Sequence, residues 1–260
     1  MKGTGVFTGP LVLLKVYPMH FLLQTINHKI VHDFAFELTR AKKYYDWLGT
    51  ESMTIRRHEG TDFSDIRDHG RYIPVGSVEF VSAYLQIFYP QATAALTPMN
   101  VPAPLFPFTG RKIANVSSPE GMDVFRNGGR VFIKSLSTIK YHGNGIVDAS
   151  EDCTGYQVSE LIDIVSEWRV FVFRGRIQHA ANYAGDCLLF PDNERIKEMV
   201  LTLGDDAPAA WTLDVGVTAC GETVVIECHR FFSCGLYGFN DHAAIPKMFS
   251  QTWHEMKRMR

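Results

Sequence analysis

Apolar positions in the first part of the chain alternate between strand and helix spacing. Short apolar runs at residues 19–25 and 52–59 predict two strands. Between them, residues 33–49 carry apolar side chains at helical spacing and end at a glycine, which predicts a helix. A second helix is expected after Ser77, a good N-cap residue, and should stop before Pro90. This strand–helix–strand–helix order is typical of an α/β region.

The pattern changes after a proline-rich stretch. Residues 97–110 hold four prolines in fourteen residues, which indicates a connection between subdomains rather than regular structure. Beyond it the apolar runs predict mainly strands, including hairpins that turn at residues 174–175 and 219–221. Residues 191–204, between the hairpins, predict a helix with a proline near its start and a glycine after its end.

These patterns predict a domain division. Residues 1–18 contain an apolar patch that Lys15 interrupts and that is too short to span a bilayer. No small-residue cleavage site follows it, so neither an export signal nor a membrane segment is predicted. We expect a poorly ordered leader at residues 1–18, an N-terminal α/β region at 19–104 and a second domain at 105–260.

Composition narrows the class of protein. Hydrophobic residues make up 46% and charged residues 21%, as in ordinary globular proteins. A net charge of −2 provides no global basic field for nucleic acid. The five cysteines form no C-x-x-C pair, which disfavours a disulfide scaffold and favours a reducing, cytoplasmic compartment. Cys228, His229 and Cys234 fit no common zinc module.

Two lysines flank a predicted strand end and a glycine loop. Lys134 follows an apolar run, and Lys140 precedes Gly143 and Gly145. Lysine can hold phosphate oxygens beside a glycine loop, because the glycine backbone N–H groups approach them closely. The loop lacks the G-K-[ST] ending of a Walker motif. On this stretch alone, two solvated lysines beside a hairpin remain the simpler interpretation.

A second group of charges lies on the predicted strand that follows. Glu167 and Arg169 share one face of an extended segment, and Glu160 precedes them. A carboxylate beside an arginine suits a nucleotide, with the acid on ribose hydroxyls and the guanidinium on phosphate. An exposed ion pair worth at most about 1 kcal/mol explains the same pattern equally well.

Two acids lie in the second hairpin. If its strands pair through the turn at residues 219–221, Asp214 and Glu227 become cross-strand neighbours on one face. Adjacent carboxylates in apolar surroundings repel each other unless a cation lies between them. Oxygen ligands near a phosphate substrate suit Mg²⁺ best. Two unrelated, solvated carboxylates are the weaker alternative, because Glu227 ends an apolar run.

The order of these residues resembles the ATP-grasp superfamily, and within it the clade named for an arginine and two lysines. The resemblance covers about residues 105–245. It implies an α/β (α+β) ATP-grasp fold, in which two subdomains clasp ATP, preceded by an N-terminal α/β pre-grasp region.

The resemblance also implies roles for single residues. The expected nucleotide-binding residues are Lys134, Lys140, Gly143, Gly145, Glu160, Leu161, Ile162, Glu167 and Arg169. In the family two lysines bind the ATP phosphates, and the linker between the lobes holds adenine, here with Glu160 near its exocyclic amine. The later acid, Glu167, would take the ribose, and Arg169 a phosphate. Lys134, Lys140 and Arg169 are the expected catalytic residues.

The same resemblance implies an Mg²⁺ site with one departure. Asp214 and Glu227 match the metal ligands. The family usually reads Glu-x-Asn at its last metal position, whereas this chain reads Glu227-Cys228-His229. His229 is the third candidate ligand, although histidine suits Mg²⁺ less well than an amide oxygen. Either the site tolerates this change or metal binding is weaker.

The implied activity is that of an ATP-dependent carboxylate–amine ligase. Such enzymes phosphorylate a carboxylate to an acyl phosphate, which an amine displaces, with release of ADP and phosphate. Two alternatives stay open: a phosphotransferase on the same fold, and a nucleotide-binding or interaction module without turnover. The carboxylate and amine substrates could be amino acids, peptides or proteins, and neither nucleic acid nor membrane is an expected partner.

Overall fold

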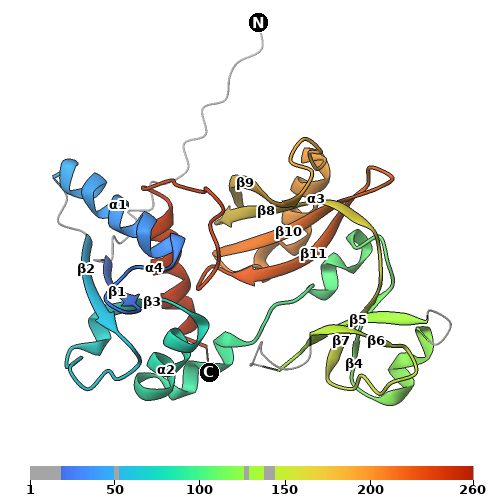
Figure 1. Cartoon of the computed structure of the whole chain (residues 1–260), viewed down its shortest axis with the longest axis horizontal. Helices are drawn as coiled ribbons and strands as arrows, with labels where there is room; N and C mark the ends of the chain where they lie inside the picture. The colour runs from blue at the N-terminus through green and yellow to red at the C-terminus, as the bar shows by residue number, and fades with distance from the viewer. Residues whose placement is uncertain (1–18, 50–52, 126–128, 138–143, 260) are drawn as a thin grey trace, which may run out of the picture.

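The computed structural model describes residues 19–49, 53–125, 129–137 and 144–259. The predicted leader at residues 1–18 lies outside the described residues. Figure 1 shows an N-terminal lobe, a central sheet and a smaller sheet. In the described part of the chain, no helix combines the length and the apolar character needed to cross a membrane.

Helices and strands alternate in the N-terminal lobe, and strands dominate afterwards. The α-helices are α1 (Asp33–Trp47), α2 (Val78–Phe88), α3 (Asn193–Leu203) and α4 (Ile245–Met256). The strands are β1 (Met19–Thr25), β2 (Met53–Glu59), β3 (Tyr72–Val75), β4 (Ile113–Val116), β5 (Arg130–Ser135), β6 (Gly145–Asp148), β7 (Tyr156–Glu160), β8 (Ile164–Phe173), β9 (Arg176–Gly185), β10 (Ala210–Thr218) and β11 (Thr223–Arg230).

The N-terminal lobe is built on a three-stranded parallel sheet with β1 between β2 and β3. Every residue of β1 is buried, as expected for a parallel strand that helices cover. α2 begins after Ser77, whose side chain accepts a hydrogen bond from the N–H of Phe80, so the predicted N-cap is confirmed. The sequence did not predict β3, because this strand is short and contains Pro74, which only a sheet edge tolerates.

The C-terminal helix α4 returns to the N-terminal lobe. Figure 1 shows it in red beside the blue and cyan elements of that lobe. Its buried residues Ile245, Met248 and Trp253 belong to the same apolar core as Phe21 and Leu38. The sequence did not predict this helix. The domain boundaries remain predictions, but the two ends of the described chain share one core.

The central sheet is antiparallel, with the strand order β11-β10-β8-β9. Both predicted hairpins form. The turn between β8 and β9 has positive φ at Arg174 (50°) and Gly175 (70°), as a type I′ turn requires. Trp168, Val170 and Val172 pack with α3 in an apolar core. Because side chains alternate along a strand, the opposite face carries the charged residues of β8.

The smaller sheet is antiparallel and has the order β4-β7-β5-β6. It has its own apolar core, which includes Val116, Val131 and Val158. Residues 161–163 connect β7 to β8 and so link the two antiparallel sheets. The predicted strands around β5 and β7 form, whereas the four-residue strands β4 and β6 were not predicted. The helices and antiparallel sheets together give the predicted α+β class.

Candidate functional site

Three charged side chains form a row across the central sheet. Asp214 on β10 pairs with Glu227 on β11 on one side and with Arg169 on β8 on the other. The predicted cross-strand pairing of Asp214 and Glu227 is therefore confirmed. Directly after this pair, between Asp214 and Val215, the register of β10 against β11 shifts. The row lies on the sheet face opposite α3, so the alternation predicted for β8 is also confirmed.

Arg169 and Asp214 form a buried, two-pronged ion pair. Nε of Arg169 donates to Oδ1 at 2.8 Å, and Nη2 donates to Oδ2 at 2.7 Å. Asp214 is only 1% exposed. Burial raises the pKa of the Asp214 carboxyl, but Arg169 and His229 outweigh burial and lower that pKa below its usual range. Both partners therefore stay charged.

This pairing corrects one interpretation of the sequence. The alternative of an exposed ion pair between Glu167 and Arg169 is wrong, since Arg169 is buried and pairs with Asp214. Glu167 instead forms a hydrogen bond with Tyr183. Burial, together with the negative charge of Asp214 and this hydrogen bond, raises the pKa of Tyr183, so its phenol is protonated and donates to Glu167.

Lys134 connects the smaller sheet to the central sheet. Its Nζ on β5 contacts Oε2 of Glu227 on β11, and its side chain is only 13% exposed. The alternative of a solvated lysine is therefore wrong. Burial raises the pKa of Glu227, but the hydrogen bond and charge of His229, together with Lys134, lower it well below its usual range. The carboxylate is thus ionised, with Lys134 and His229 as its neighbours.

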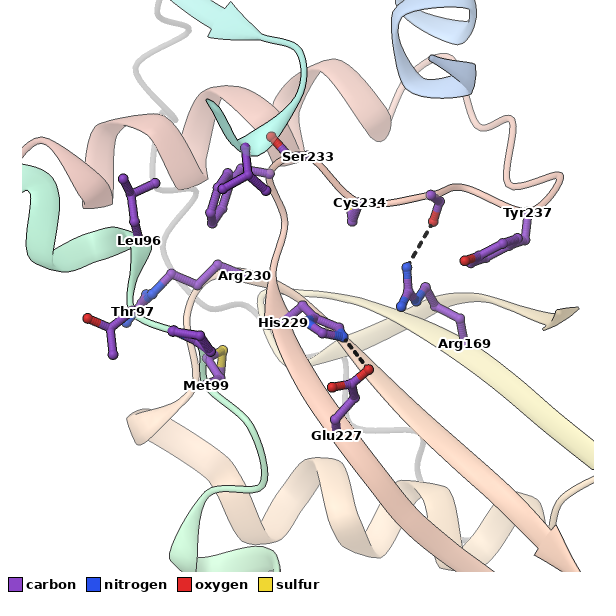
Figure 2. Close-up of a pocket in the computed structure, with 14 residues that line it drawn as sticks. Leu96, Thr97, Met99, Arg169, Glu227, His229, Arg230, Ser233, Cys234 and Tyr237 are labelled. Atoms are coloured by element: carbon purple, nitrogen blue, oxygen red, sulfur yellow. Dashed lines mark hydrogen bonds and ion pairs between the residues drawn. The ribbon is translucent and has the colours of Figure 1, made fainter. Parts of the chain in front are cut away.

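His229 completes a cluster of possible metal ligands. It follows Glu227 by two residues on β11 and so shares its face. Nε2 of His229 lies 3.0 Å from Oε1 of Glu227 and 3.6 Å from Oδ2 of Asp214, and Figure 2 shows the contact with Glu227. One ligand atom from each of the three residues lies within 4.8 Å of the others. Two carboxylates with an adjacent imidazole fit a divalent cation.

Cys228 takes no part in this cluster. It is buried in the core on the α3 side of the sheet. Burial raises the pKa of its thiol well above the usual value, so the thiol is neutral. This placement agrees with the interpretation that Cys228 belongs to no zinc module.

A cleft of about 590 Å³ lies between the two antiparallel sheets. Its volume is in the usual range for small-molecule sites. The predicted residues that line it are Lys134, Glu160, Leu161, Ile162, Glu167, Arg169, Asp214 and Glu227. Gly145 begins β6 and pairs with Ile133; it does not itself line the cleft, whereas its neighbour Asn144 does. Lys140 and Gly143 lie outside the described residues.

The linker residue Glu160 has a partner in the structure. Its Oε2 accepts a hydrogen bond from the N–H of Lys112 at 2.9 Å, and its Oε1 lies 3.3 Å from Nζ of Lys112. The backbone hydrogen bond from Lys112 lowers the pKa of Glu160. The carboxylate is therefore directed to Lys112, and the predicted contact of Glu160 with adenine stays a prediction.

The cleft also contains residues that the sequence did not single out. Arg111 donates from Nη1 to the carbonyl oxygens of Thr109 and Val225, both at 3.1 Å. Tyr183 and Tyr237 stack with ring centroids 5.2 Å apart. Tyr183 could have been found from strand alternation in β9. Arg111 and Tyr237 lie outside strands and helices, so periodicity offers no signal for them.

The guanidinium of Arg169 lies beside this tyrosine pair, near both rings. Its Cζ lies 5.7 Å from the ring centroid of Tyr183 and 5.1 Å from that of Tyr237. Nη1 of Arg169 donates to the carbonyl oxygen of Gly235 at 3.3 Å. Arg169 is therefore held in place from three sides, by a carboxylate, two rings and a backbone carbonyl.

Two antiparallel sheets with a charged cleft between them agree with the two subdomains expected of an ATP-grasp fold. The family model described as the ATP-grasp domain of R2K clade family 2 matches residues 108–246, more than half of the chain. The chain belongs to this family, so the predicted superfamily and clade are confirmed. No curated protein matches the sequence.

Solved structures of an ATP-grasp ligase, a synthetase and a second ligase have a similar fold. The ligase PsnB in complex with a minimal precursor superposes with a TM-score of 0.54 at 12% identity, over 90% of this chain and 99% of that chain. D-cycloserine synthetase DcsG superposes with a TM-score of 0.52 at 10% identity, over 91% of this chain and 99% of that chain. D-alanine–D-alanine ligase from Bacillus anthracis superposes with a TM-score of 0.51 at 10% identity, over 92% of this chain and 99% of that chain. At these identities the similarity shows the fold.

Proposed function

We propose that the chain is an ATP-dependent carboxylate–amine ligase that acts through an acyl phosphate and releases ADP and phosphate. One observation carries the proposal. Lys134 from one sheet and Arg169 from the other border the paired carboxylates Asp214 and Glu227 in a single cleft. Cations on both sides of a candidate metal site suit a nucleoside triphosphate.

The nucleotide would lie between the two sheets. The linker residues Leu161 and Ile162 would hold adenine, and Glu167 would accept hydrogen bonds from the ribose. The phosphates would then reach Lys134 and Arg169 at the other end of the same cleft. Lys140, Gly143 and Gly145, the first residue of β6, remain predicted phosphate-binding residues.

Asp214 and Glu227 would hold Mg²⁺, with His229 as the third candidate ligand. The donor set fits, because two ionised carboxylates are brought together by strand pairing in a largely buried site. The ion would share the oxygens of Asp214 with the guanidinium of Arg169. When bound, Mg²⁺ would neutralise charge on the phosphate oxygens. Lys134, which neutralises Glu227 in the structure, would then be free to contact a phosphate oxygen.

The reaction follows from positioning and charge. A carboxylate oxygen of the substrate bonds to the γ-phosphorus while the bond from phosphorus to the bridging oxygen of ADP breaks. The amine then attacks the acyl carbon, phosphate leaves with the C–O electron pair, and the nitrogen loses a proton. Lys134 and Arg169 stabilise the developing negative charge. No protein nucleophile is required, and Cys228 is unsuited to be one because its thiol is neutral.

Ligases with the same fold support this proposal. PsnB is described as an ATP-grasp ligase and has been solved with a minimal precursor, and with Mg and ADP when bound to a phosphomimetic variant of it. DcsG is a D-cycloserine synthetase. A nucleotide, Mg²⁺ and a carboxylate–amine pair are therefore the proposed ligands of this chain, and a cytoplasmic location remains a prediction.

The activity is tested with pools of acids and amines incubated with Mg-ATP. We expect ADP release together with a product whose mass is that of acid plus amine minus water. A phosphorylated acceptor without condensation would replace the proposal by the phosphotransferase. Nucleotide binding without ADP release in any pool would favour the module without turnover.

Lys134→Ala is expected to slow turnover strongly. The variant lacks a cation that stabilises charge in phosphoryl transfer, which corresponds to about 2–4 kcal/mol in activation free energy. The rate of ADP formation under saturating Mg-ATP measures the effect. Lys197→Ala is the control, because Lys197 lies on α3 and its side chain is 57% exposed. Equal rates for Lys134→Ala and the unmodified protein would remove Lys134 from the catalytic set.

His229→Asn tests the departure from the usual Glu-x-Asn pattern. An amide oxygen is the better Mg²⁺ ligand, so we expect the variant to keep or improve Mg²⁺-dependent nucleotide binding. Titration of a fluorescent ATP analogue at several Mg²⁺ concentrations measures the affinity of each protein. Loss of this binding in a folded variant would show that His229 has a role that asparagine cannot fill.

A further inference from the structure

A second pocket, of about 270 Å³, lies beside the nucleotide cleft. Figure 2 shows its lining, which comes from the start of α2, the segment after Leu96, the end of β11 and the loop that follows it. Arg169, Glu227 and Tyr237 line both the pocket and the cleft. The linker proposed to hold adenine lines only the cleft. The pocket therefore adjoins the cleft at its charged end, where the phosphates are proposed to lie.

Two arginines, Arg169 and Arg230, line this pocket against the single carboxylate of Glu227. Glu227 is already in contact with Lys134 and His229, and Arg169 is paired with Asp214. Arg230 supplies the positive charge that no carboxylate of the described residues contacts. A ligand with negative charge is therefore favoured here, and the amide N–H groups at the start of α2 add to this preference.

Arg230 differs from Arg169, the other arginine of the pocket. Its side chain makes no hydrogen bond or ion pair with any residue that the structure describes, although burial lowers its pKa. Glu255 attracts it but accepts hydrogen bonds from the N–H of Ala209. On its other side Arg230 borders a surface groove that Arg258 also lines. A half-buried guanidinium without a direct partner is costly, and an anionic ligand would remove that cost.

The two arginines of the pocket, Arg230 and Arg169, lie at opposite ends of it. In Figure 2 the side chain of Arg230 extends toward Thr97, whereas His229 and Arg169 lie on the side of Glu227. Met99 lies between these ends. Such a layout suits a ligand with a negative group at each end and a short carbon chain between them.

We propose that this pocket binds the acid substrate, and that this acid is a small molecule with two anionic groups. One carboxylate lies at the junction beside Arg169, where it receives the phosphoryl group. The second anionic group pairs with Arg230. At about 270 Å³, against about 590 Å³ for the cleft, the pocket has the size for a small acid. This proposal rests on the proposed ligase function and adds the class of acid.

Isosteric pairs of acids test the proposal. The full chain, saturated with Mg²⁺ and a non-hydrolysable ATP analogue, is titrated calorimetrically with succinate and succinamate, glutarate and glutaramate, and L-glutamate and L-glutamine. A hydrogen-bonded charge contributes about 1.5–3 kcal/mol, so at least one diacid should bind about 10-fold or more tighter than its monoamide. In Arg230→Gln this preference should fall to about twofold or less.

Controls separate the possible failures. Arg258→Gln should keep the preference, since Arg258 is exposed and does not line the pocket. Arg230→Gln should bind the ATP analogue as the unmodified protein does, which shows that it is folded. Nucleotide binding without any preference for diacids, or a preference that Arg230→Gln retains, would overturn this inference alone. Absence of nucleotide binding in the unmodified protein would overturn the proposed function and this inference with it.

Discussion

Arg169→Ala is expected to lower the free energy of unfolding by about 3–5 kcal/mol, because it leaves the carboxylate of Asp214 buried without its main partner. Arg169 supplies both hydrogen bonds of the ion pair, and Asp214 has almost no access to water that could replace them. Urea unfolding followed by circular dichroism measures the change. Arg176→Ala, at an exposed position of β9 in the same sheet, should change stability by less than about 0.5 kcal/mol.

A double variant separates the ion pair from general damage to the sheet. Arg169→Leu with Asp214→Leu removes both charges, so the double variant should be more stable than Arg169→Leu alone. Both variants should lack ligase activity. A double variant that is no more stable than the single one would contradict the claim that an unpaired carboxylate causes the loss.

The same ion pair makes the stability of the folded protein depend on pH. In the folded protein the pKa of Asp214 lies below its unfolded value, which is about 3.9 for a free aspartate. Its stabilising contribution is therefore present above about pH 4 and is lost as the pH falls through the folded pKa. We expect the unmodified protein to lose stability in this acid range, and Arg169→Ala to lose less, because the main cause of the lowered pKa is absent.

Asp214→Asn and Glu227→Gln should each abolish Mg²⁺-dependent nucleotide binding. Either change removes one of the two ionised carboxylates that the strand pairing brings together. Mutation of a residue that only hydrogen-bonds to a metal ligand typically lowers metal affinity about 10- to 100-fold. Removal of a ligand itself should therefore lower the affinity for Mg²⁺ by at least about 100-fold. Titration of a fluorescent ATP analogue with MgCl₂, and its reversal with EDTA, measures the effect.

A control and a decisive outcome accompany this experiment. Glu222→Gln, at the exposed turn of the same hairpin, should bind nucleotide normally. Circular dichroism must show that the two site variants are folded, since Asp214 also pairs with Arg169. Nucleotide binding that is independent of metal, together with normal turnover in Asp214→Asn and Glu227→Gln, would remove the chemical basis of the ligase proposal.

Local patterns predicted a large part of the fold. The helices α1, α2 and α3 and the two hairpins of the central sheet were readable, because periodicity, caps and turns are short-range features. Elements of four residues, such as β3 and β6, were not readable, since so few residues carry no reliable period. The sequence did not predict helix α4. Its apolar side chains are buried in the core of the N-terminal lobe, a contact that only the structure shows.

The sequence by itself determined which residues share a strand face. Alternation placed Glu167 and Arg169 on one side of β8, and the short turn of the second hairpin placed Asp214 opposite Glu227. These relations depend on strand geometry and on a few residues of turn, so no distant part of the chain can change them.

Only the tertiary structure decided which charges meet. Residues two apart on one strand face are farther from each other than direct cross-strand neighbours, so Arg169 pairs with Asp214 on β10 and leaves Glu167 to Tyr183. The contact of Lys134 with Glu227 joins two sheets across 93 residues of sequence. The placement of one lobe against another depends on the packing of whole sheets, which no local pattern encodes.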